Sequence, residues 1–205
     1  MTISTYQLKS RFQSLLRPLA VWLYQHHVTA NQVTIAACFI SVVLGVLAAI
    51  FPERNYLFLL ISFGCLLRMA ANALDGMLAR EYGQASPLGA VLNELGDLIA
   101  DVALYLPFAL IAGSQPWLVV AIVLLAMLSE FTGLLGVALG NERCNDGPMA
   151  KSDRALVFGI VGLLVGCGVG VAPYINLLWA LTAALRVLTL FNRARSALRN
   201  PQETS

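Results

Sequence analysis

Two groups of polar residues interrupt a chain that is otherwise strongly apolar, and each group falls on one face of a helix. The groups are Asn72, Asp75, Gly76 and Ala79, at positions i, i+3, i+4 and i+7, and Gly89, Asn93, Asp97 and Asp101, at every fourth position. The connection between them is short, so we expect the two helices to be antiparallel neighbours. Their carboxylate and amide oxygens would then face each other across a gap that the small residues keep narrow.

Such a gap suits a hard divalent cation such as magnesium, which accepts carboxylates, amide oxygens and water. A metal of this kind binds phosphate in turn, and Arg80, beside the first group, can donate to a phosphate oxygen. The residue types therefore indicate phosphoryl-type chemistry, in which catalysis consists largely of clamping oxygens and neutralising charge. In the alternative, the polar groups only pair with one another between helices, although ionisable groups inside a membrane are usually functional.

The composition indicates that these helices lie in a membrane, since 59% of the 205 residues are hydrophobic, 12% are charged and the mean hydropathy is +0.76. Apolar runs near the roughly 20 residues that cross a bilayer cover 33–51, 56–74, 87–112, 117–139, 155–171 and 174–191. Backbone hydrogen bonds must be satisfied within each segment in lipid. The sequence therefore predicts an all-α integral membrane bundle of six transmembrane helices.

The Lys and Arg residues predict the orientation, because cytoplasmic loops of bacterial membrane proteins collect them. They cluster before the first run, in the second and fourth connections and after the last run, which places both termini and the polar groups on the cytoplasmic side. Residues 1–27 predict an amphipathic helix on the inner leaflet. We expect one membrane domain over residues 1–205, with its six-helix part at 28–205, surrounded by membrane lipids and with no nucleic-acid partner.

The polar groups resemble the signature of the CDP-alcohol phosphotransferases, or CDP-alcohol phosphatidyltransferases, which reads D-x2-D-G-x2-A-R-x8-G-x3-D-x3-D. Every interval of that pattern is preserved from Asn72 to Asp97. The segment HVTANQVTI, residues 27–35, is similar to the T-P-N-x-[IV]-T start of the family, with Ala30 in place of the proline. Six spans and an amphipathic leading helix agree with the family over nearly the whole chain, which resembles an enterobacterial inner-membrane member.

The resemblance implies an enzyme of phospholipid synthesis in the bacterial inner membrane. A CDP-linked lipid such as CDP-diacylglycerol would be the donor, and an alcohol hydroxyl would attack its β-phosphorus and release CMP. The implied ligands of magnesium or manganese are Asn72, Asp75, Asn93 and Asp97. The resemblance also implies that Asp97 is the general base and that the CDP pocket is lined by Gly76, Ala79 and Arg80. Members of the family are commonly homodimers.

Two positions depart from the signature, because Asn72 and Asn93 stand where the pattern has aspartate. An amide oxygen still coordinates a metal, but the site loses two negative charges. We therefore expect the site to bind metal more weakly, whether it holds one ion or two. Glu94 or Asp101 could restore charge. The alternative function is a catalytically inactive member that binds CDP-lipid or scaffolds a lipid-synthesis complex. A transporter is disfavoured, because its polar residues would be distributed through the membrane depth.

Charged residues elsewhere provide candidates for the acceptor site and for buried ion pairs. Lys151 and Arg154, at the mouth of the fifth run, would suit a phosphorylated or otherwise anionic alcohol, although the positive-inside rule alone predicts basic residues there. Glu130 and Arg186 could pair with each other, or Glu130 could reach a cavity near the site. Arg68 could set the charge of the metal site or meet a lipid phosphate.

Overall fold

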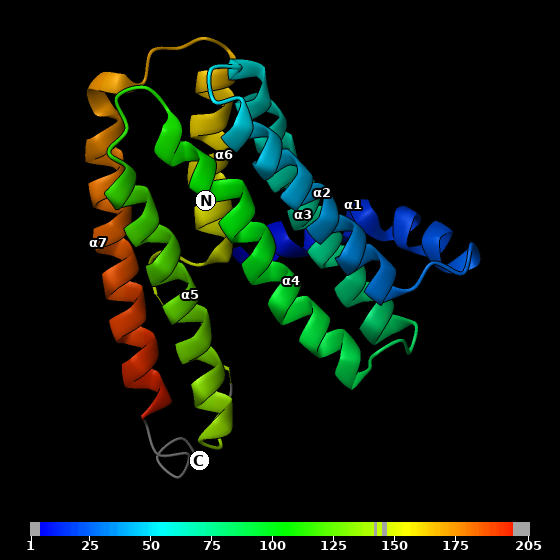
Figure 1. The fold of residues 1–205 in the computed structure, drawn as a ribbon. Coiled ribbons are helices and arrows are strands. Elements are labelled where there is room, and N and C mark those ends of the chain that lie inside the picture. Colours follow the sequence, from blue (N-terminus) through cyan, green and yellow to red (C-terminus); the bar gives the residue numbers. More distant parts are fainter. Residues whose placement is uncertain (1–4, 142, 145–146, 199–205) are drawn as a thin grey trace.

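The computed structural model describes residues 5–141, 143–144 and 147–198, and over these residues every regular element is a helix (Figure 1). In chain order the helices are α1 (Thr5–Gln25), α2 (Ala30–Ile50), α3 (Asn55–Glu81), α4 (Pro87–Tyr105), the 3-10 helix η1 (Leu106–Leu110), α5 (Pro116–Ala138), α6 (Lys151–Gly166) and α7 (Ala172–Ala197). The predicted all-α class is confirmed for this part of the chain.

Local signals in the sequence determine where the helices near the polar groups begin. Thr29 and Gln32 form a capping box at the start of α2, in which each side chain accepts a hydrogen bond from the other residue's backbone N–H. Ser86 caps α4, and Pro87 takes the first helical position, where a missing N–H removes no helical hydrogen bond. At the start of α6, the Asp153 carboxylate accepts the backbone N–H three residues earlier, at 2.7 Å.

The helices follow the predicted apolar runs, with two differences in extent. The third run was expected to be one helix over 87–112, but α4 ends at Tyr105 and the chain continues as η1. Pro107 accounts for the change, because it lacks the N–H that an α-helical hydrogen bond requires. In contrast, α3 continues past residue 74 to Glu81, so the first polar group lies on a regular helix.

Among the described residues, four helices, α2, α3, α5 and α7, are long and apolar enough to cross a membrane. The helix α6, which corresponds to the fifth predicted span, has only 16 residues. At roughly 1.5 Å per residue it is about 24 Å long, which is less than the hydrocarbon thickness of about 30 Å. The helix α4 differs from the four longer helices because three acidic residues, Glu94, Asp97 and Asp101, interrupt its apolar sequence. The structure thus supports four of the six predicted spans by length and composition.

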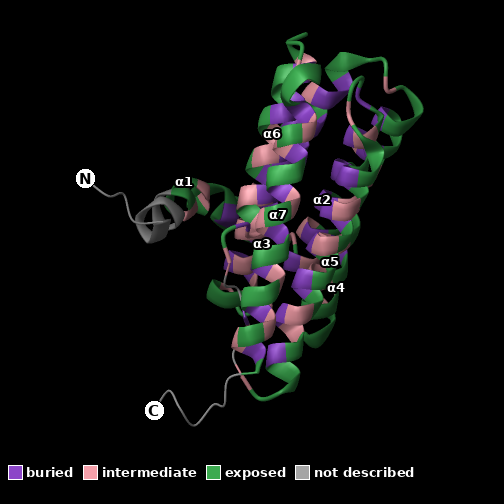
Figure 2. Ribbon diagram, turned by 90° about the vertical axis from the view of Figure 1, so that its left-hand side faces the viewer, coloured by how far each residue is buried: buried purple, intermediate pink, exposed green. Residues whose placement is uncertain are grey.

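The outer surface of the bundle is apolar. Large side chains that are exposed include Phe39, Phe63, Phe131 and Phe191. Buried residues face the neighbouring helices, as the stripes in Figure 2 show. An apolar surface that surrounds the helices in this way suits lipid better than water.

The helices pack as two connected groups. In one, α2 lies against α3 and α4, and in the other α5 lies against α7, while α6 packs on α3 (Figure 1). The first helix, α1, extends sideways from the bundle, and its Ala20 packs against Leu74 and Met77 of α3. The part of α3 that carries the polar group is therefore held between α1, α2 and α6.

An aromatic cluster forms part of the core between α4, η1, α6 and α7. Phe158 of α6 stacks on Trp179 of α7 with ring centroids 4.9 Å apart and on Tyr105 of α4 at 4.2 Å. Phe108 of η1 meets Phe158 edge to face. These contacts join four elements, so the core fixes α4, α6 and α7 relative to one another.

Close packing of α6 on α3 predicts the effect of adding a methyl group at Gly162. A Cβ there would lie 2.7 Å from the carbonyl oxygen of Phe58 and 2.5 Å from Oγ of Ser62. We expect Gly162→Ala to destabilise the fold by about 1–3 kcal/mol, measured as a lower Tm in detergent. The matched control is Gly159→Ala on the same helix, whose Cβ would have its nearest neighbour 4.0 Å away. Equal Tm values for the two variants would contradict the packing.

Candidate active site

The two predicted polar faces meet between α3 and α4. Nδ2 of Asn72 on α3 donates a hydrogen bond to Oδ1 of Asp97 on α4, at 3.1 Å. Asp75 lies one turn beyond Asn72 on α3, and Asn93 lies one turn before Asp97 on α4. The four predicted ligands therefore come from facing helices, as the spacing of the residues indicated.

A third helix contributes a hydroxyl group that the sequence analysis did not single out. Oγ1 of Thr34 on α2 donates to Oδ2 of Asp75 at 2.7 Å, and both residues are buried. Thr34 belongs to the segment HVTANQVTI, which supplies a second contact through Asn31. A Cβ on Gly89 would lie 2.8 Å from Oδ1 of Asn31, so the glycine of α4 leaves room for this side chain. The segment that resembles the start of the family thus packs directly on the polar groups.

Two cationic side chains contact Asp97. The guanidinium group of Arg68 and the ammonium group of Lys151 each form an ion pair with its carboxylate. Arg68 also donates from Nη2 to the backbone oxygen of Asp97, at 3.0 Å. Its side chain is only 7% exposed, which excludes a lipid phosphate as its partner in this arrangement. Of the two roles considered for Arg68, the structure supports setting the charge of the site.

A chain of buried ion pairs continues from Arg68 into the bundle. Asp101 accepts from Nε of Arg68 at 3.3 Å and from Nη2 of Arg154 at 2.7 Å. Arg154 donates from Nη1 to Oε1 of Glu130 at 3.2 Å, and Oε2 of Glu130 lies 3.2 Å from Nη1 of Arg193. The chain connects α3, α4, α6, α5 and α7 in that order. Arg193, on the last helix, was not identified from the sequence.

The expected pairing of Glu130 with Arg186 is wrong. Arg186 donates instead to the backbone oxygens of Met149 and Leu125, the second at 3.1 Å. Glu130 follows the other expectation, because it lines a small cavity together with Asp97 and other charged residues. Backbone carbonyl oxygens accept the hydrogen bonds of the Arg186 guanidinium group. The spacing of residues along a helix does not predict such partners.

The charge of Lys151 depends strongly on its surroundings. Lys151 is the first residue of α6 and precedes the apolar part of that helix. Burial of its ammonium group and the guanidinium charges of Arg68 and Arg154 lower the pKa of Lys151 to about 7, and the carboxylates of Glu94 and Asp75 oppose this shift only in part. The direct contact with the Asp97 carboxylate opposes the shift as well, because it favours the charged ammonium form.

The residues predicted to line a CDP pocket lie together at the end of α3. A Cβ on Gly76 would lie 2.8 Å from Nη2 of Arg80, so the guanidinium group folds back over the glycine. Arg80 is exposed, while Ala79 is half-buried beside it. Because Gly76 has no side chain, the guanidinium group of Arg80 has room to lie over it at the surface of the site.

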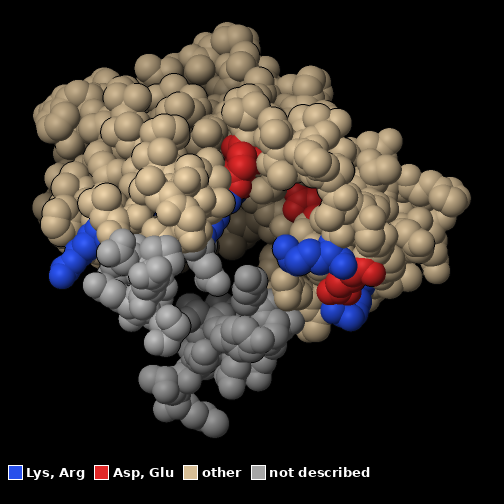
Figure 3. All heavy atoms as spheres, turned by 90° about the horizontal axis from the view of Figure 1, so that it is seen from below, with Lys and Arg blue, Asp and Glu red and all other residues tan. Residues whose placement is uncertain are grey.

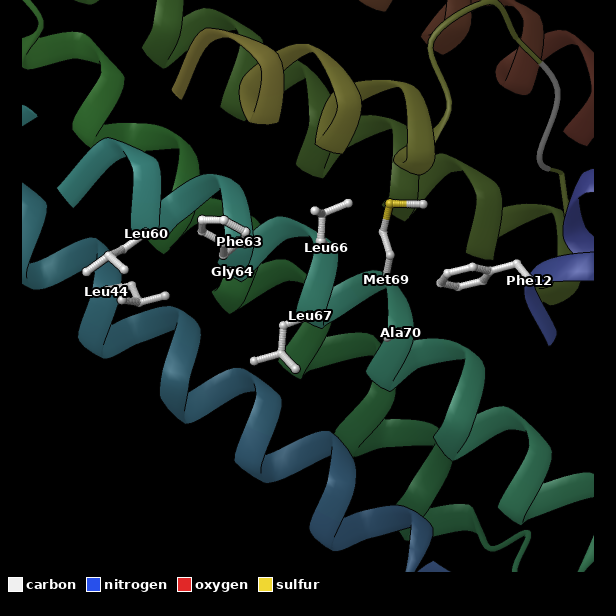
Figure 4. Close-up of a pocket in the computed structure, with 9 residues that line it drawn as sticks. All are labelled: Phe12, Leu44, Leu60, Phe63, Gly64, Leu66, Leu67, Met69 and Ala70. Carbon is white, nitrogen blue, oxygen red and sulfur yellow. The ribbon is translucent and has the colours of Figure 1, made fainter. Parts of the chain in front are cut away.

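Charged side chains define one cavity and apolar side chains another. The charged cavity has a volume of about 10 Å³ and is lined by Glu94, Asp97, Leu98, Asp101, Glu130, Arg143, Lys151 and Arg154. Acidic and basic side chains also surround a hollow on the lower face of the molecule (Figure 3). The apolar cavity, of about 660 Å³, follows α3 from Leu60 to Ala70, with Leu44 of α2 and Phe12 of α1 at its edges (Figure 4). Of these two cavities, the charged one includes Asp97 and lies beside the polar groups of α3 and α4.

Within the part of the chain that the structure describes, no three Asp, Glu, His or Cys side chains converge so that they could hold a metal. The predicted ligand set has two carboxylates, Asp75 and Asp97, and two amides, Asn72 and Asn93. Glu94 and Asp101, considered as replacements for the lost charge, are instead paired with Arg143 and with Arg68 and Arg154.

The chain belongs to the CDP-alcohol phosphatidyltransferase family, whose sequence model matches residues 27–192. This match confirms the resemblance noted from the signature, and it makes the chain a member of a family of phospholipid-synthesis transferases. The matched residues include α2 to α6 and most of α7, and the match ends one residue before Arg193.

Particular relatives resemble the chain over most of its length. It is 47% identical to the inner membrane protein YnbA of Escherichia coli strain K12, over 96% of this chain and 97% of the relative. It is 29% identical to the phosphatidylinositol phosphate synthase of Corynebacterium glutamicum, over 92% of this chain and 86% of the relative. The crystal structure of phosphatidylinositol phosphate synthase PgsA1 of Mycobacterium tuberculosis, in complex with manganese and citrate, has the same fold, with a TM-score of 0.72 at 21% identity over 92% of this chain and 91% of that one.

The buried ion pairs predict a large effect of neutralising Asp101. We expect Asp101→Asn to reduce the free energy of unfolding by about 3–5 kcal/mol, because Arg68 and Arg154 would lose a shared buried carboxylate. The control is Glu53→Gln, which removes a carboxylate from an exposed pair with Arg54 and should change stability by less than about 1 kcal/mol. Denaturant or thermal unfolding in detergent measures both. A similar loss in the two variants would show that the buried pairs do not hold the helices together.

Proposed function

We propose that the protein transfers a phosphatidyl or other substituted phosphate group from a CDP-linked lipid, such as CDP-diacylglycerol, to the hydroxyl of an alcohol in phospholipid synthesis. A bond forms between the hydroxyl oxygen and the β-phosphorus, while the bond from that phosphorus to CMP breaks. The observation that supports this most is the contact between Asn72 and Asp97, because it joins the first and last positions of the signature across α3 and α4.

The oxygen donors fit one divalent cation, magnesium or manganese. Asn72, Asp75, Asn93 and Asp97 would hold it, since carboxylates and amides are the hard ligands that these metals accept. The two carboxylates match the charge of one ion, and the amides add ligands without adding charge. When bound, the ion would neutralise the charge of the donor's pyrophosphate.

Asp97 would accept the proton of the acceptor hydroxyl. It lies between the α3 face and the start of α6, where Lys151 contacts it. Lys151 would contact the acceptor alcohol. The buried Arg154 would line the inner side of the acceptor site.

The CDP moiety would lie at the end of α3, along Gly76 and Ala79, with Arg80 as the donor to a phosphate oxygen. The exposed guanidinium group of Arg80 supports this role, because a planar donor can bind a phosphate through two N–H groups. The small residues beside it allow a ligand to approach the helix backbone.

The site would face the cytoplasm from the bacterial inner membrane. In this arrangement α4 and α6 span the bilayer together with the four longer helices, and α1 lies on the inner leaflet with both termini on the cytoplasmic side. The exposed apolar residues of α1, including Leu15 and Trp22, support contact with lipid. The chain would act as one membrane domain over residues 1–205 and would assemble as a homodimer.

A second candidate function is the binding of a CDP-lipid without turnover, or a scaffolding role in a lipid-synthesis complex. The two amides in the ligand set favour it, because they reduce the negative charge available to a metal. The two cations on Asp97 favour it as well, since they compete with a metal for that carboxylate.

Turnover separates the two functions. With CDP-diacylglycerol, manganese or magnesium and a panel of alcohols, we expect acceptor-dependent CMP release and a new lipid that mass spectrometry identifies. Asp97→Asn should reduce the rate by at least about 100-fold at saturating metal, because the acceptor loses its base. Its Tm should fall, because Arg68 and Lys151 lose a shared carboxylate, so the rates are compared at a temperature at which both proteins remain folded. Binding of the donor by the unmodified protein without any CMP release would favour the second candidate, and near-normal rates for Asp97→Asn would remove the base assignment.

Restoring the signature aspartates should strengthen metal binding. We expect Asn72→Asp with Asn93→Asp to lower the Kd for manganese by at least about tenfold, because affinity rises with the number of charged ligands. Electron paramagnetic resonance of free manganese measures the change. The control is Asn55→Asp, the same substitution at the exposed first residue of α3. An unchanged Kd in the double variant would show that these positions are not ligands.

A further inference from the structure

Asp75 is a buried carboxylate that has no direct cationic partner among the described residues. It is 7% exposed, and the ion pairs of this part of the chain do not include it. The carboxylate of Asp97, in contrast, contacts two cations. Burying a charge without an opposite charge is costly. Of the two carboxylates in the proposed ligand set, Asp75 is therefore the one whose charge remains available to a metal ion.

The side chain that holds Asp75 is that of Thr34 on α2. Its Oγ1 lies 2.7 Å from Oδ2 of Asp75 and 3.1 Å from the backbone oxygen of Ala30, one turn earlier. The shorter contact is the one to the carboxylate, where a hydroxyl group forms a charge-assisted hydrogen bond. The other buried hydroxyl groups for which the structure describes a donated hydrogen bond donate to backbone oxygens, as is common in helices; they belong to Ser41, Ser62, Ser129, Thr182 and Thr189.

The first turn of α2 is fixed against α4 and against the connection between α3 and α4. The backbone N–H of Ala30 donates to Oε1 of Gln84 in that connection, at 2.7 Å. A proline at position 30, as in the family pattern, would have no N–H to donate. On the α4 side, Asn31 lies where a Cβ on Gly89 would be 2.8 Å from its Oδ1. Thr34, one turn after Ala30, is thereby held in place beside both polar faces.

We propose that Thr34 is a positioning residue for the metal site, whose hydroxyl group orients the carboxylate of Asp75 toward the ion. This inference rests on the proposed function and adds a residue outside the ligand set. A neutral donor suits the task, because it fixes the carboxylate without cancelling the negative charge that attracts the metal. Losing such a partner of a metal ligand typically lowers metal affinity by about 10–100-fold.

Removing the hydroxyl group should weaken metal binding. Thr34→Val keeps the branched shape and removes the donor, so we expect the Kd for manganese to rise by at least about tenfold. Electron paramagnetic resonance of free manganese measures it on the full chain in detergent, without donor lipid or acceptor. Thr34→Ser keeps the hydroxyl group and should retain most of the affinity. Thr34→Ala also lacks the donor, and it replaces the valine variant in this comparison if that variant does not fold.

The matched control is Thr182→Val on α7. Thr182 is 1% exposed, and its hydroxyl group donates to the backbone oxygen of Leu178 at 2.8 Å. This substitution removes a buried hydroxyl group that does not contact a carboxylate, so it should leave the Kd for manganese unchanged even where it lowers the Tm.

The outcomes separate the inference from the proposed function. An unchanged Kd in Thr34→Val, an equal rise in Thr182→Val, or an equal rise in Thr34→Ser would overturn the inference and leave the function standing. No manganese binding by the unmodified protein would overturn the inference together with the metal site. Acceptor-dependent CMP release, measured on the same preparation, tests the function separately. The expected rise in Kd without any CMP release would support the positioning role and favour the second candidate function.

Discussion

Charges buried in an apolar bundle must lie beside opposite charges, and this constraint organises the functional half of the protein. One connected series of ion pairs runs through Asp97, Arg68, Asp101, Arg154, Glu130 and Arg193. Because the members alternate in sign and come from five helices, moving one helix would leave a charge unpaired on another. The position of Asp97, where the signature residues meet, therefore depends on residues of α5 and α7 that do not contact it.

The same constraint gives Asn72 a structural meaning. Asp97 is shared between Asn72, Arg68 and Lys151, so its carboxylate already has three polar partners. An aspartate at position 72 would bring a second negative charge to this point. The amide instead donates a hydrogen bond, which stabilises the arrangement of α3 on α4.

The sequence predicted the helices well, because apolar runs and helix-capping residues are local signals. It also predicted that the α3 and α4 faces meet, since a short connection leaves antiparallel helices few other arrangements. The partners of buried charges were harder to predict: pairing with Arg186 was one of two alternatives for Glu130, whereas its carboxylate contacts Arg143, Arg154 and Arg193. Such choices depend on how distant helices are rotated and packed, which the spacing of residues within one helix does not determine. Thr34 was missed for a similar reason, although it lies in a segment that the sequence analysis had already marked.

We propose that the two signature faces hold a divalent metal despite the asparagines at positions 72 and 93. Crystals of the full chain grown with manganese and CDP-diacylglycerol would test it through anomalous scattering at the manganese edge. The account predicts a peak among Asn72, Asp75, Asn93 and Asp97, with the donor's pyrophosphate beside it. A peak at another location, or CDP-diacylglycerol bound at these residues with no manganese peak, would contradict it.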